Sequence, residues 1–344
     1  MCCVYRGGEI MGFRVLKGGL LTTVQDIGRT GYQSQGFGTS GVMDVRSFKI
    51  ANMLIDNPEN EAVLEFTMIG PTLEFTSETI IAITGGDFQP LINKKPAPMY
   101  TAIYINKGDV LEFQGARTGV RGYIAFSCYL NIPVIMGSRS TNMKCRIGGF
   151  KGRNLKEGDY ISFRIRRRYL PYFLSRTLDL DEFNQEDEVL RVIMGPQDNL
   201  FTKEGKKTFL NSEFTITNDF DRMGCRIEGP YIAHKESADI ISDGIALGAI
   251  QVPAHGKPII LLSDRQTTGG YPKIATVVTV DLPKLVQRKA DHKIRFKAIS
   301  VEEAQNLLIE EMNEFTQFRK KIHAPCKEVL DVRFVSKRLE TLFD

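Results

Sequence analysis

Residues 263–275 carry, in one short stretch, the side chains needed for chemistry on an acyl, carbamoyl or phosphoryl group. The stretch SDRQTTGGYPKIA lies between two apolar runs, 258–262 and 276–282. Cations and hydroxyls stabilise developing negative charge, a carboxylate can transfer a proton, and an ordinary connection needs only a few polar residues. We therefore predict a functional loop. Its candidates are Asp264, Arg265 and Lys273 as catalytic groups and Gln266, Thr267, Thr268 and Tyr271 as binding groups, joined by Gln251 from the preceding GAIQVP.

A second polar segment, GLLTTVQDIGRTGYQSQGFGTSGVMD at 19–44, is rich in glycine. Glycine lets a backbone adopt positive φ or approach another group closely. The spacing matches neither a dinucleotide-binding GxGxxG nor a P-loop. A long surface loop is one interpretation, and a binding loop is the other. On the second interpretation Gln25, Asp26 and Arg29 bind substrate, and Asp44 is an acid/base or metal-bridging candidate.

Two shorter motifs add arginines beside turns. In GSRST (137–141), Arg139 stands between Ser138 and Ser140 and is followed by Thr141. A guanidinium fork with hydroxyls is suited to a carboxylate or phosphate, although a plain polar turn is the alternative. In DRMGCRIEGP (221–230), Arg222 precedes a glycine turn. Here the alternative is a set of surface ion pairs that contribute little.

Several common chemistries have little support. The four histidines, at 234, 255, 292 and 323, are scattered, which argues against a zinc site or a Ser-His-Asp triad. We predict no metal. The six cysteines form no CxxC pair, which favours reduced thiols and a cytoplasmic location. Cys128 and Cys225 lie in apolar strand contexts and are expected to be inert.

Composition limits the classes of protein further. A chain of 344 residues with 42% hydrophobic and 25% charged residues is typical of a soluble protein of two domains. We interpret the basic cluster RIRRRY (164–169) as a charged edge rather than a nucleic-acid site. The apolar runs fall short of the ~20 residues of a membrane span. The first ten residues are expected to form a loose leader, with Met1 or Met11 as the start.

Short β-rich runs separated by turn residues dominate both halves of the chain, which indicates a barrel or sandwich. Only 44–57 and 300–322 show a helical pattern, the latter opened by the capping pattern Ser300-x-x-Glu303. The similar pairs GSRST/SDRQTTGG and GDVLEF/GDYISF suggest an internal duplication. The predicted organisation is a first domain at 11–165, a linker at 166–188, a second domain at 189–300, and a C-terminal helix and tail at 301–344.

Taken together, these strings resemble one family. TTVQDIGRTGYQSQG, SGVMD, GSRST, GPQD, DRMGCRIEGP, SDGI, GAIQVP and DRQTTGGYPKIA are similar to the family known as the C subunit of 5-oxoprolinase, allophanate hydrolase subunit 2 or KipI antagonist (KipA). That family is related to the carboxyltransferase domain of urea amidolyase. The resemblance runs from about Phe13 to Ala298.

The resemblance implies a mainly β fold of two tandem cyclophilin-like β-barrel subdomains with a few short helices. It implies two protein partners, a homologous, KipI-like B subunit and a LamB/YcsF-like A subunit, and a small anionic amide as substrate. It further implies ATP as a cofactor of the complex, with no covalent biotin on this chain. Neither nucleic acid nor a membrane is expected as a partner.

The leading hypothesis is a component of an ATP-dependent 5-oxoprolinase, an enzyme that opens the amide ring of 5-oxoproline to give glutamate. Arg29, Arg139 and Arg265 would then be anion clamps that converge on one pocket. Gln251, Gln266 and the hydroxyls of 267–268 would orient the amide, while Lys273 would stabilise the transferring group. The alternatives are a KipI-antagonist regulator that binds a histidine-kinase inhibitor, and the carboxyltransferase subunit of a biotin-dependent urea or amide carboxylase.

Overall fold

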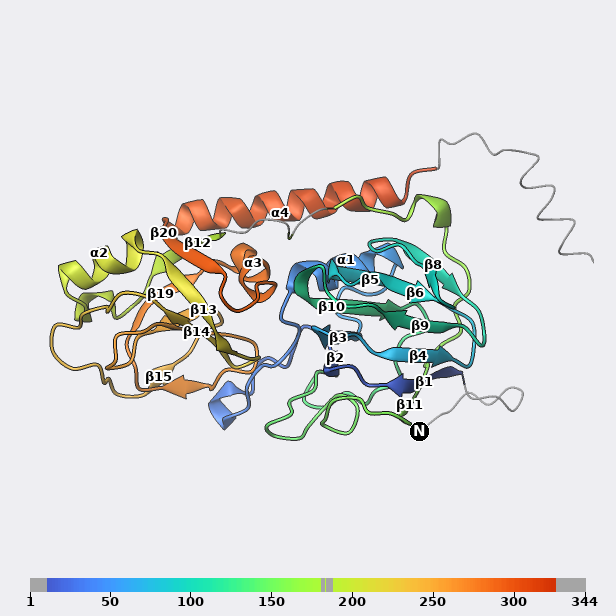
Figure 1. Cartoon of the computed structure of the whole chain (residues 1–344), viewed down its shortest axis with the longest axis horizontal. Helices are drawn as coiled ribbons and strands as arrows, with labels where there is room; N and C mark the ends of the chain where they lie inside the picture. Colours follow the sequence, from blue (N-terminus) through green and yellow to red (C-terminus); the bar gives the residue numbers. More distant parts are fainter. Residues whose placement is uncertain (1–10, 181–182, 184–187, 326–344) are drawn as a thin grey trace, which may run out of the picture.

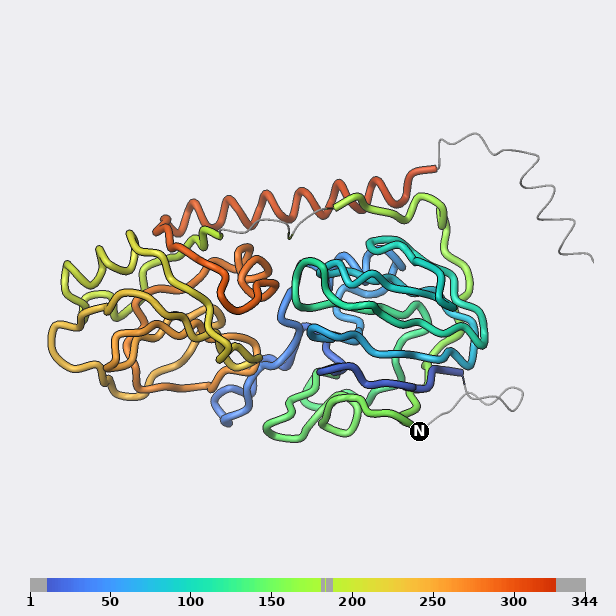
Figure 2. Tube along the Cα trace, viewed as in Figure 1, coloured from blue at the N-terminus to red at the C-terminus, as the bar shows by residue number. Residues whose placement is uncertain are grey.

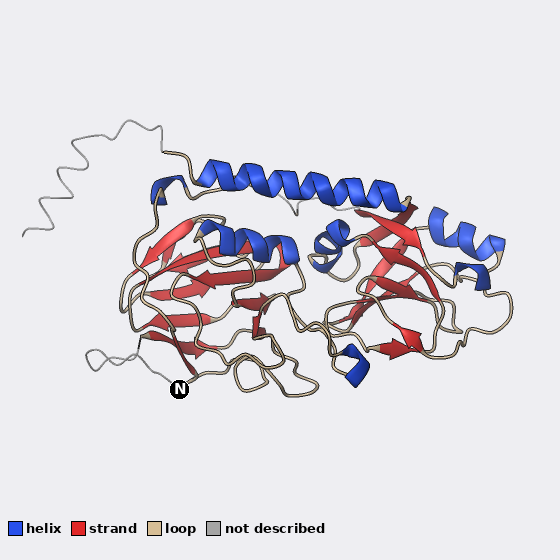
Figure 3. Cartoon of the chain, turned by 180° about the vertical axis from the view of Figure 1, so that it is seen from behind, coloured by secondary structure: helices blue, strands red, loops and turns tan. Residues whose placement is uncertain are grey.

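The chain folds into a mainly β structure, given by a computed structural model that describes residues 11–180, 183 and 188–325. Two β-rich halves lie side by side, and one long helix runs across both of them (Figures 1 and 3). The predicted leader at 1–10, part of the predicted linker and the tail at 326–344 lie outside the described residues.

The first half is built from two antiparallel sheets. One has the order β11-β1-β4-β9-β6-β7, and the other has the order β2-β3-β10-β5-β8. The strands are β1 (Gly12–Lys17), β2 (Leu21–Gln25), β3 (Val63–Thr67), β4 (Thr72–Phe75), β5 (Thr79–Asp87), β6 (Pro90–Ile92), β7 (Lys95–Pro96), β8 (Ala102–Ile105), β9 (Val110–Phe113), β10 (Thr118–Phe126) and β11 (Tyr160–Ser162).

A closed barrel forms the second half, with the order β12-β19-β16-β17-β14-β13-β20, and β15 pairs with β18 beside it. Within the described barrel, β12 pairs in parallel with β20, so the first and last strands of this half close it. The strands are β12 (Glu188–Met194), β13 (Phe214–Phe220), β14 (Gly224–Glu228), β15 (Asp243–Gly244), β16 (Ala249–Gln251), β17 (Ile259–Leu261), β18 (Thr268–Gly269), β19 (Lys273–Val277) and β20 (Lys293–Ala298).

Each half has its own hydrophobic core. Phenylalanines fill the space between the two sheets, where Phe13 stacks on Phe126 with ring centroids 5.1 Å apart. Aliphatic side chains and stacked Phe209 and Phe296, 4.5 Å apart, fill the barrel. Separate cores allow each half to position its own loops independently of the other.

The mainly β prediction is confirmed, and two details differ from expectation. Among the described residues one closed barrel is present rather than two, because the strands of the first half are divided between separate sheets. The run at 276–280 is also not a single strand. β19 begins earlier, at Lys273, whereas Thr279–Asp281 forms a 3-10 turn that leads into a helix with Pro283 at its start.

The helices are α1 (Val45–Leu54), α2 (Lys203–Asn211), α3 (Leu282–Val286) and α4 (Val301–Ile322). Short 3-10 helices occur at Gln33–Gln35, Phe173–Ser175, Asp198–Leu200 and Thr279–Asp281. The sequence predicted α1 and α4. The capping box of α4 is present in full, since Ser300 and Glu303 each bond the other's backbone N–H. Sequence pattern did not indicate α2 and α3, which are short.

α4 lies along one side of the molecule and contacts both halves (Figure 2). Toward its C-terminal end, Phe315, Phe318 and Ile322 pack against the core around α1. Arg46 of α1 pairs with Glu314 at 2.7 Å and lies over the ring of Phe315 at 5.6 Å. The helix therefore packs against α1 in the first half, and it contacts the barrel half at the turn 279–281.

The basic cluster at 164–169 is paired with carboxylates of the same chain. Arg164 bonds Glu61 at 2.6 Å, and Arg168 bonds Glu78 at 2.6 Å. The cluster is thus a set of intramolecular ion pairs at an edge of the first half. Within the described ranges, no helix has the length and apolar character needed to cross a bilayer.

Asp281 makes the stability of the fold depend on pH. Its buried carboxylate accepts from the backbone N–H of Arg191 and from Nε of Arg191, both at 2.8 Å. Burial alone would raise the pKa of Asp281, but the bonds from Arg191 outweigh it and hold the pKa below its usual range. This carboxylate therefore stabilises the fold above its unfolded pKa of about 3.9, and the contribution is lost as pH falls through the folded pKa.

We predict that Asp281→Asn lowers the free energy of unfolding at pH 7 and flattens its dependence on pH below about pH 4. Denaturant unfolding at a series of pH values measures both effects. Asp179→Asn, at an exposed position, is the control and is expected to retain the wild-type pH slope. Equal slopes in wild type and Asp281→Asn would contradict the assignment.

Candidate functional site

Loops from both halves meet on the side of the molecule away from α4, where the segment 26–44 crosses from the first half to the barrel (Figures 1 and 3). Three bonds from the barrel hold this segment. Ser263 Oγ donates to the carbonyl of Val42 at 3.0 Å, Arg265 Nη1 donates to Thr39 Oγ1 at 3.2 Å, and Arg222 donates to the carbonyl of Gly41. The motifs 19–44, 221–230 and 263–275 are therefore brought together.

Asp26 organises the part of the site that belongs to the first half. Its Oδ1 accepts from the hydroxyls of Ser138 and Ser140, both at 2.6 Å, and its Oδ2 accepts from the backbone N–H of Arg139 at 2.6 Å. Gln25 donates to the carbonyl of Thr141 at 3.2 Å. The two predicted motifs 25–29 and 138–141 are thus one hydrogen-bonded unit, held by a carboxylate whose acceptor sites are occupied.

Arg29 is 1% exposed yet lacks partners for most of its guanidinium. Nη2 donates to the carbonyl of Ser140, whereas Nε and Nη1 have no hydrogen-bond partner among the described residues. Burial lowers the pKa of Arg29, and the nearby carboxylates of Asp26 and Asp264 partly offset this effect. Buried donors without acceptors are costly, so two N–H groups remain available for an anion.

Tight backbone packing surrounds Arg29. Gly148 has φ of 65°, and a Cβ there would lie 2.6 Å from Arg29 Nη2. Within the segment 26–44, Gly31 and Gly36 have φ of 90° and 83°, and apart from their chain neighbours no described atom lies within 4 Å of where a Cβ would stand. The backbone at Gly148 therefore packs closely against the guanidinium, whereas the turns at Gly31 and Gly36 have free space beside them.

The other two arginines of the predicted clamp are partnered differently. Arg139 Nε donates to the carbonyl of Ile132 at 3.1 Å. Arg265 donates from Nε to the carbonyl of Ile245 at 3.0 Å, and burial lowers its pKa. Arg265 meets Thr39, whose carbonyl accepts from the N–H of Arg29 at 2.8 Å. All three arginines therefore lie along one connected set of loops. The Nε donors of Arg139 and Arg265 are occupied by hydrogen bonds to backbone carbonyls.

Arg222 joins the two halves through buried charges. It pairs with Glu65 of β3 and, at 2.9 Å, with Asp264 of the barrel. Burial would lower the pKa of Arg222, but the carboxylates of Asp264 and Glu65 outweigh burial and raise it. The alternative interpretation of Arg222 as a surface residue is wrong, because its side chain is 6% exposed. Asp264 is the partner of Arg222 within the barrel half.

Asp44 caps helix α1. Its carboxylate accepts from the N–H of Ser47 at 2.9 Å, from the hydroxyl of Ser47 at 2.6 Å and from Gln287 Nε2 at 2.8 Å. The side chain is fully buried. These bonds give Asp44 a structural role as an N-cap, and its acid/base or metal-bridging role stays a prediction.

Lys273 belongs to a separate cluster on the barrel. Its Nζ is buried and pairs with Asp243 Oδ2 at 3.0 Å, and this lysine holds the pKa of Asp243 below its usual range. Gln197 bonds both Asp243 and the backbone N–H of Lys273, each at 3.2 Å. Gln251 donates to the carbonyl of Tyr271 at 3.4 Å. The strings GPQD, SDGI, GAIQVP and GGYPK therefore converge at this cluster.

The remaining predicted residues lie along β18 and its flanks. Gln266, Thr268 and Tyr271 are exposed, and Thr267 is half-buried. The carbonyl of Thr267 accepts from the N–H of Ile245 at 3.1 Å, and Thr268 pairs with Gly244. This stretch therefore packs on the loop at 240–245 and presents hydroxyl, amide and phenol groups to solvent.

Sequence reasoning missed several residues of the site. Glu65 pairs with Arg222 and also accepts from Tyr123 at 2.9 Å. Gln287 accepts from the N–H groups of residues 120 and 121 and donates to Asp44. No local signal marks Glu65 or Gln287, since each stands within an otherwise ordinary strand or helix end. Gln197 and Asp243 belong to the strings GPQD and SDGI, and could have been proposed from them.

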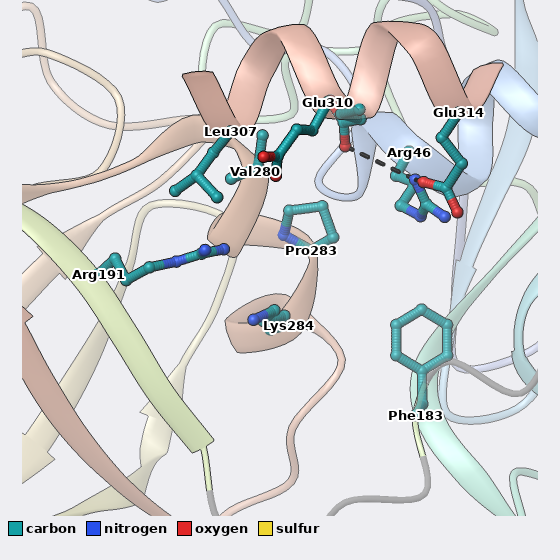
Figure 4. A pocket seen from close by; sticks show the side chains of 10 residues that line it. Arg46, Phe183, Arg191, Val280, Pro283, Lys284, Leu307, Glu310 and Glu314 are labelled. Atoms are coloured by element: carbon teal, nitrogen blue, oxygen red, sulfur yellow. Dashed lines mark hydrogen bonds and ion pairs between the residues drawn. The ribbon is translucent and has the colours of Figure 1, made fainter. Parts of the chain in front are cut away.

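The cavity drawn in Figure 4 lies elsewhere, beneath α4, and has a volume of about 520 Å³. Its acidic side chains all come from α4 and its basic ones from other elements, and none of the predicted site residues is among those that line it: Arg46, Phe183, Arg191, Val280, Pro283, Lys284, Leu307, Glu310, Glu311 and Glu314. Among the described residues, no group of three or more His, Cys, Asp or Glu side chains could hold a metal ion. Burial raises the pKa of the Cys225 thiol to about 12, in keeping with an unreactive cysteine.

Comparisons with known proteins identify the family. The model of the carboxyltransferase domain, subdomains A and B, matches residues 35–298. The chain belongs to this family. It is 30% identical over 315 residues to the C subunit of 5-oxoprolinase from Escherichia coli K12, a match that covers 90% of this chain and 98% of that one. The corresponding protein of Haemophilus influenzae is 32% identical over 285 residues, with coverage of 83% and 90%.

A solved structure supports the fold. The crystal structure of the K. lactis urea amidolyase superimposes with a TM-score of 0.83 and 29% sequence identity over 91% of this chain. The present chain spans only 20% of that protein. The two β-rich halves therefore correspond to one region of a much larger enzyme.

We predict that the buried pair between Arg222 and Glu65 stabilises the contact between the halves. Arg222→Ala leaves a buried carboxylate without its cation and should lower the free energy of unfolding by about 3–5 kcal/mol. Glu65→Gln combined with Arg222→Ala should cost less than the sum of the single changes, with a coupling energy of about 0.5–3 kcal/mol. Denaturant unfolding measures both.

Arg226→Ala provides the control, because Arg226 faces Asp219 at 4.0 Å with both side chains largely exposed. Such a pair contributes at most about 1 kcal/mol. Additive effects of Arg222→Ala and Glu65→Gln would contradict the proposed coupling between the halves.

Proposed function

We propose that this chain is the C subunit of a heteromeric, ATP-dependent 5-oxoprolinase that opens the amide ring of 5-oxoproline to give glutamate. The observation that supports this most directly is the similarity to the Escherichia coli protein, which extends over nearly the full length of both chains. Since that relative is one subunit of an enzyme by its name, we propose that this chain acts in the cytoplasm with two partners, a homologous B subunit and a LamB/YcsF-like A subunit.

We further propose that Arg29 binds the substrate carboxylate. Its Nε and Nη1 have no partner among the described residues, and each can donate a charged hydrogen bond to an oxygen of a bound anion. Gln25 Oε1, also buried without a partner among the described residues, is an available acceptor in the same hydrogen-bonded unit. We propose that a ligand reaches the buried Arg29 through movement of the loop at 30–38, where the glycine turns at 31 and 36 have free space beside them.

The barrel cluster is the candidate for work on the amide. Lys273 and Gln251 are held on adjacent strands, β19 and β16, which pair at these two residues. A cation and an amide can stabilise and orient a developing oxyanion. Asp264 and Arg265 would act from the loop that links this cluster to Arg29. The exposed Gln266, Thr268 and Tyr271, with the half-buried Thr267 between them, would face a partner protein or the substrate.

ATP is assigned to the assembled complex, and no residue of this chain is assigned to nucleotide contact. The proposal includes cyclophilin-like subdomains at 11–165 and 189–300, a linker at 166–188, and a C-terminal region at 301–344. The closed barrel of the second half supports the second of these subdomains.

A biotin-dependent carboxyltransferase is the second candidate, favoured by the name of the matching family and by the likeness to urea amidolyase. On this alternative the same loops would pass a carboxyl group to urea or another amide, with biotin carried on another chain. The two functions differ in a simple way: only the first consumes 5-oxoproline without added carboxybiotin.

Reconstitution with the A and B subunits tests the assignment. We expect ATP-dependent conversion of 5-oxoproline to glutamate by the wild-type complex, and a loss of at least about 100-fold in kcat/KM for Arg29→Met, since a buried charged hydrogen bond to substrate is removed. Arg226→Met, at an exposed arginine, should retain wild-type activity. Binding of 5-oxoproline should raise the Tm of the wild-type complex and not that of the variant.

A wild-type complex that fails to turn over 5-oxoproline would exclude the 5-oxoprolinase assignment. Turnover that survives Arg29→Met in a folded complex would instead remove Arg29 from the binding site and leave the enzyme assignment intact. Carboxylation of urea by the chain when supplied with carboxybiotin would favour the second candidate.

A further inference from the structure

The outer face of α4 carries apolar side chains that nothing in the described chain covers. Leu308 is 42% exposed, Ile309 54% and Met312 61%, and Val301, one turn or more earlier, is 51% exposed. Isolated exposed apolar residues are common on protein surfaces. These four, however, belong to a single helix, and Val301 and Leu308 lie in heptad register with Phe315 and Ile322, which pack on the protein nearer the C-terminal end of the helix.

Helical spacing places these residues on one stripe. Positions three and four apart are neighbours on a helix, so Val301, Gln305, Leu308, Ile309, Met312 and Thr316 form a continuous row, which we call the outer stripe. The stripe contains no charged residue. An apolar centre from which charges are absent is the composition of the core of a protein interface.

Acidic and basic residues are instead separated along the helix: its three basic residues lie in the last turn, and its glutamates, Glu302, Glu303, Glu310, Glu311 and Glu314, all lie before that turn. Glu302 and Glu303 stand at its start, and Arg319, Lys320 and Lys321 stand at its end. This arrangement suits the helix dipole. It also makes the helix self-complementary when a second copy runs in the opposite direction, because each acidic end then meets a basic end. A parallel copy would bring like charges together.

We propose that α4 is the interface of a two-fold symmetric dimer of this chain, formed by antiparallel packing of two outer stripes. With 22 residues the helix is about 33 Å long, enough for several turns of contact. Ile309 and Met312 of the two copies lie opposite each other near the axis, and Glu302 faces the Arg319–Lys320 end of the other copy. An interface that uses the same patch on both copies closes without further growth.

The position of α4 makes this dimer compatible with the proposed enzyme function. The dimer proposal does not depend on that function. The family model matches residues up to 298, and α4 begins at Val301, so the stripe lies outside the matched region. It also lies on the side of the molecule opposite the segment 26–44 (Figure 1). A dimer formed through α4 therefore leaves the candidate site open to other proteins of the complex.

Sedimentation equilibrium of the full chain tests the proposal. We expect a monomer–dimer equilibrium, with Met312→Glu raising the dissociation constant about tenfold or more, because it places two charges at the centre of the interface. Leu20→Glu, at another exposed apolar residue, is the matched control and should dimerise as the wild type does.

A charge exchange tests the antiparallel direction. Glu302→Lys and Lys320→Glu should each weaken the dimer, and the two together should restore it, since each end then again meets its opposite in the other copy. Restoration excludes a non-specific effect of charge.

Three results would overturn the proposal. The first is a chain that stays monomeric up to roughly 100 µM, and the second is a dimer that Met312→Glu leaves intact. The third is a monomer whose Tm falls on Met312→Glu, which would show that the chain itself covers the stripe. Leu20→Glu shows whether a charge added at any exposed apolar position changes the solubility or association of the chain, so an effect specific to Met312→Glu can be recognised.

Discussion

The contact between the two halves depends on a buried arginine. Arg222 leaves the barrel at the turn between β13 and β14 and ends between Glu65 of the first half and Asp264 of its own half. A charge in this position is stable only while both carboxylates remain beside it. The same arginine bonds the carbonyl of Gly41 and thereby fixes the segment that crosses between the halves. The relative position of all the candidate groups follows from this arrangement.

Around that contact the site divides into two kinds of polar group. The carboxylates of Asp26 and Asp44 are bonded within the chain itself, and these bonds define the shape of the loops. Arg29 has donors in excess of its acceptors among the described residues, although it is deeply buried. A folded protein rarely leaves such groups without partners, and this excess is the reason that we propose Arg29 as a ligand-binding group.

The sequence was sufficient for the fold class, for most strands and for both ends of α4, because alternation of apolar residues and the capping pattern at Ser300 are local signals. The family resemblance implied a barrel in each half, which holds for the second half but not for the described first half. Local pattern alone could not decide between an open and a closed sheet, since closure depends on pairing between β12 and β20, about a hundred residues apart. Motif residues such as Arg29 and Lys273 were found from their types and spacing. Glu65 and Gln287 were not, because their roles arise only from tertiary contact.

Sequence alone also cannot distinguish a side chain that binds substrate from one that stabilises a loop. Arg29, Arg139 and Arg265 look alike in sequence, each near hydroxyl residues and a turn. What separates Arg29 from Arg139 is the burial of its unpartnered nitrogens, and that burial is known only from atomic positions.

Gln287 has a consequence for how a substrate could enter. Its amide joins α3 of the barrel to the backbone of β10 and to the residue that caps α1. If one half rotated away from the other, the side-chain amide of Gln287 would lose these hydrogen bonds, and α1 would lose part of its N-cap at the same time. Separation of the halves would therefore also weaken the start of α1, whereas a change confined to the loop at 30–38 would leave the hydrogen bonds of Gln287 in place.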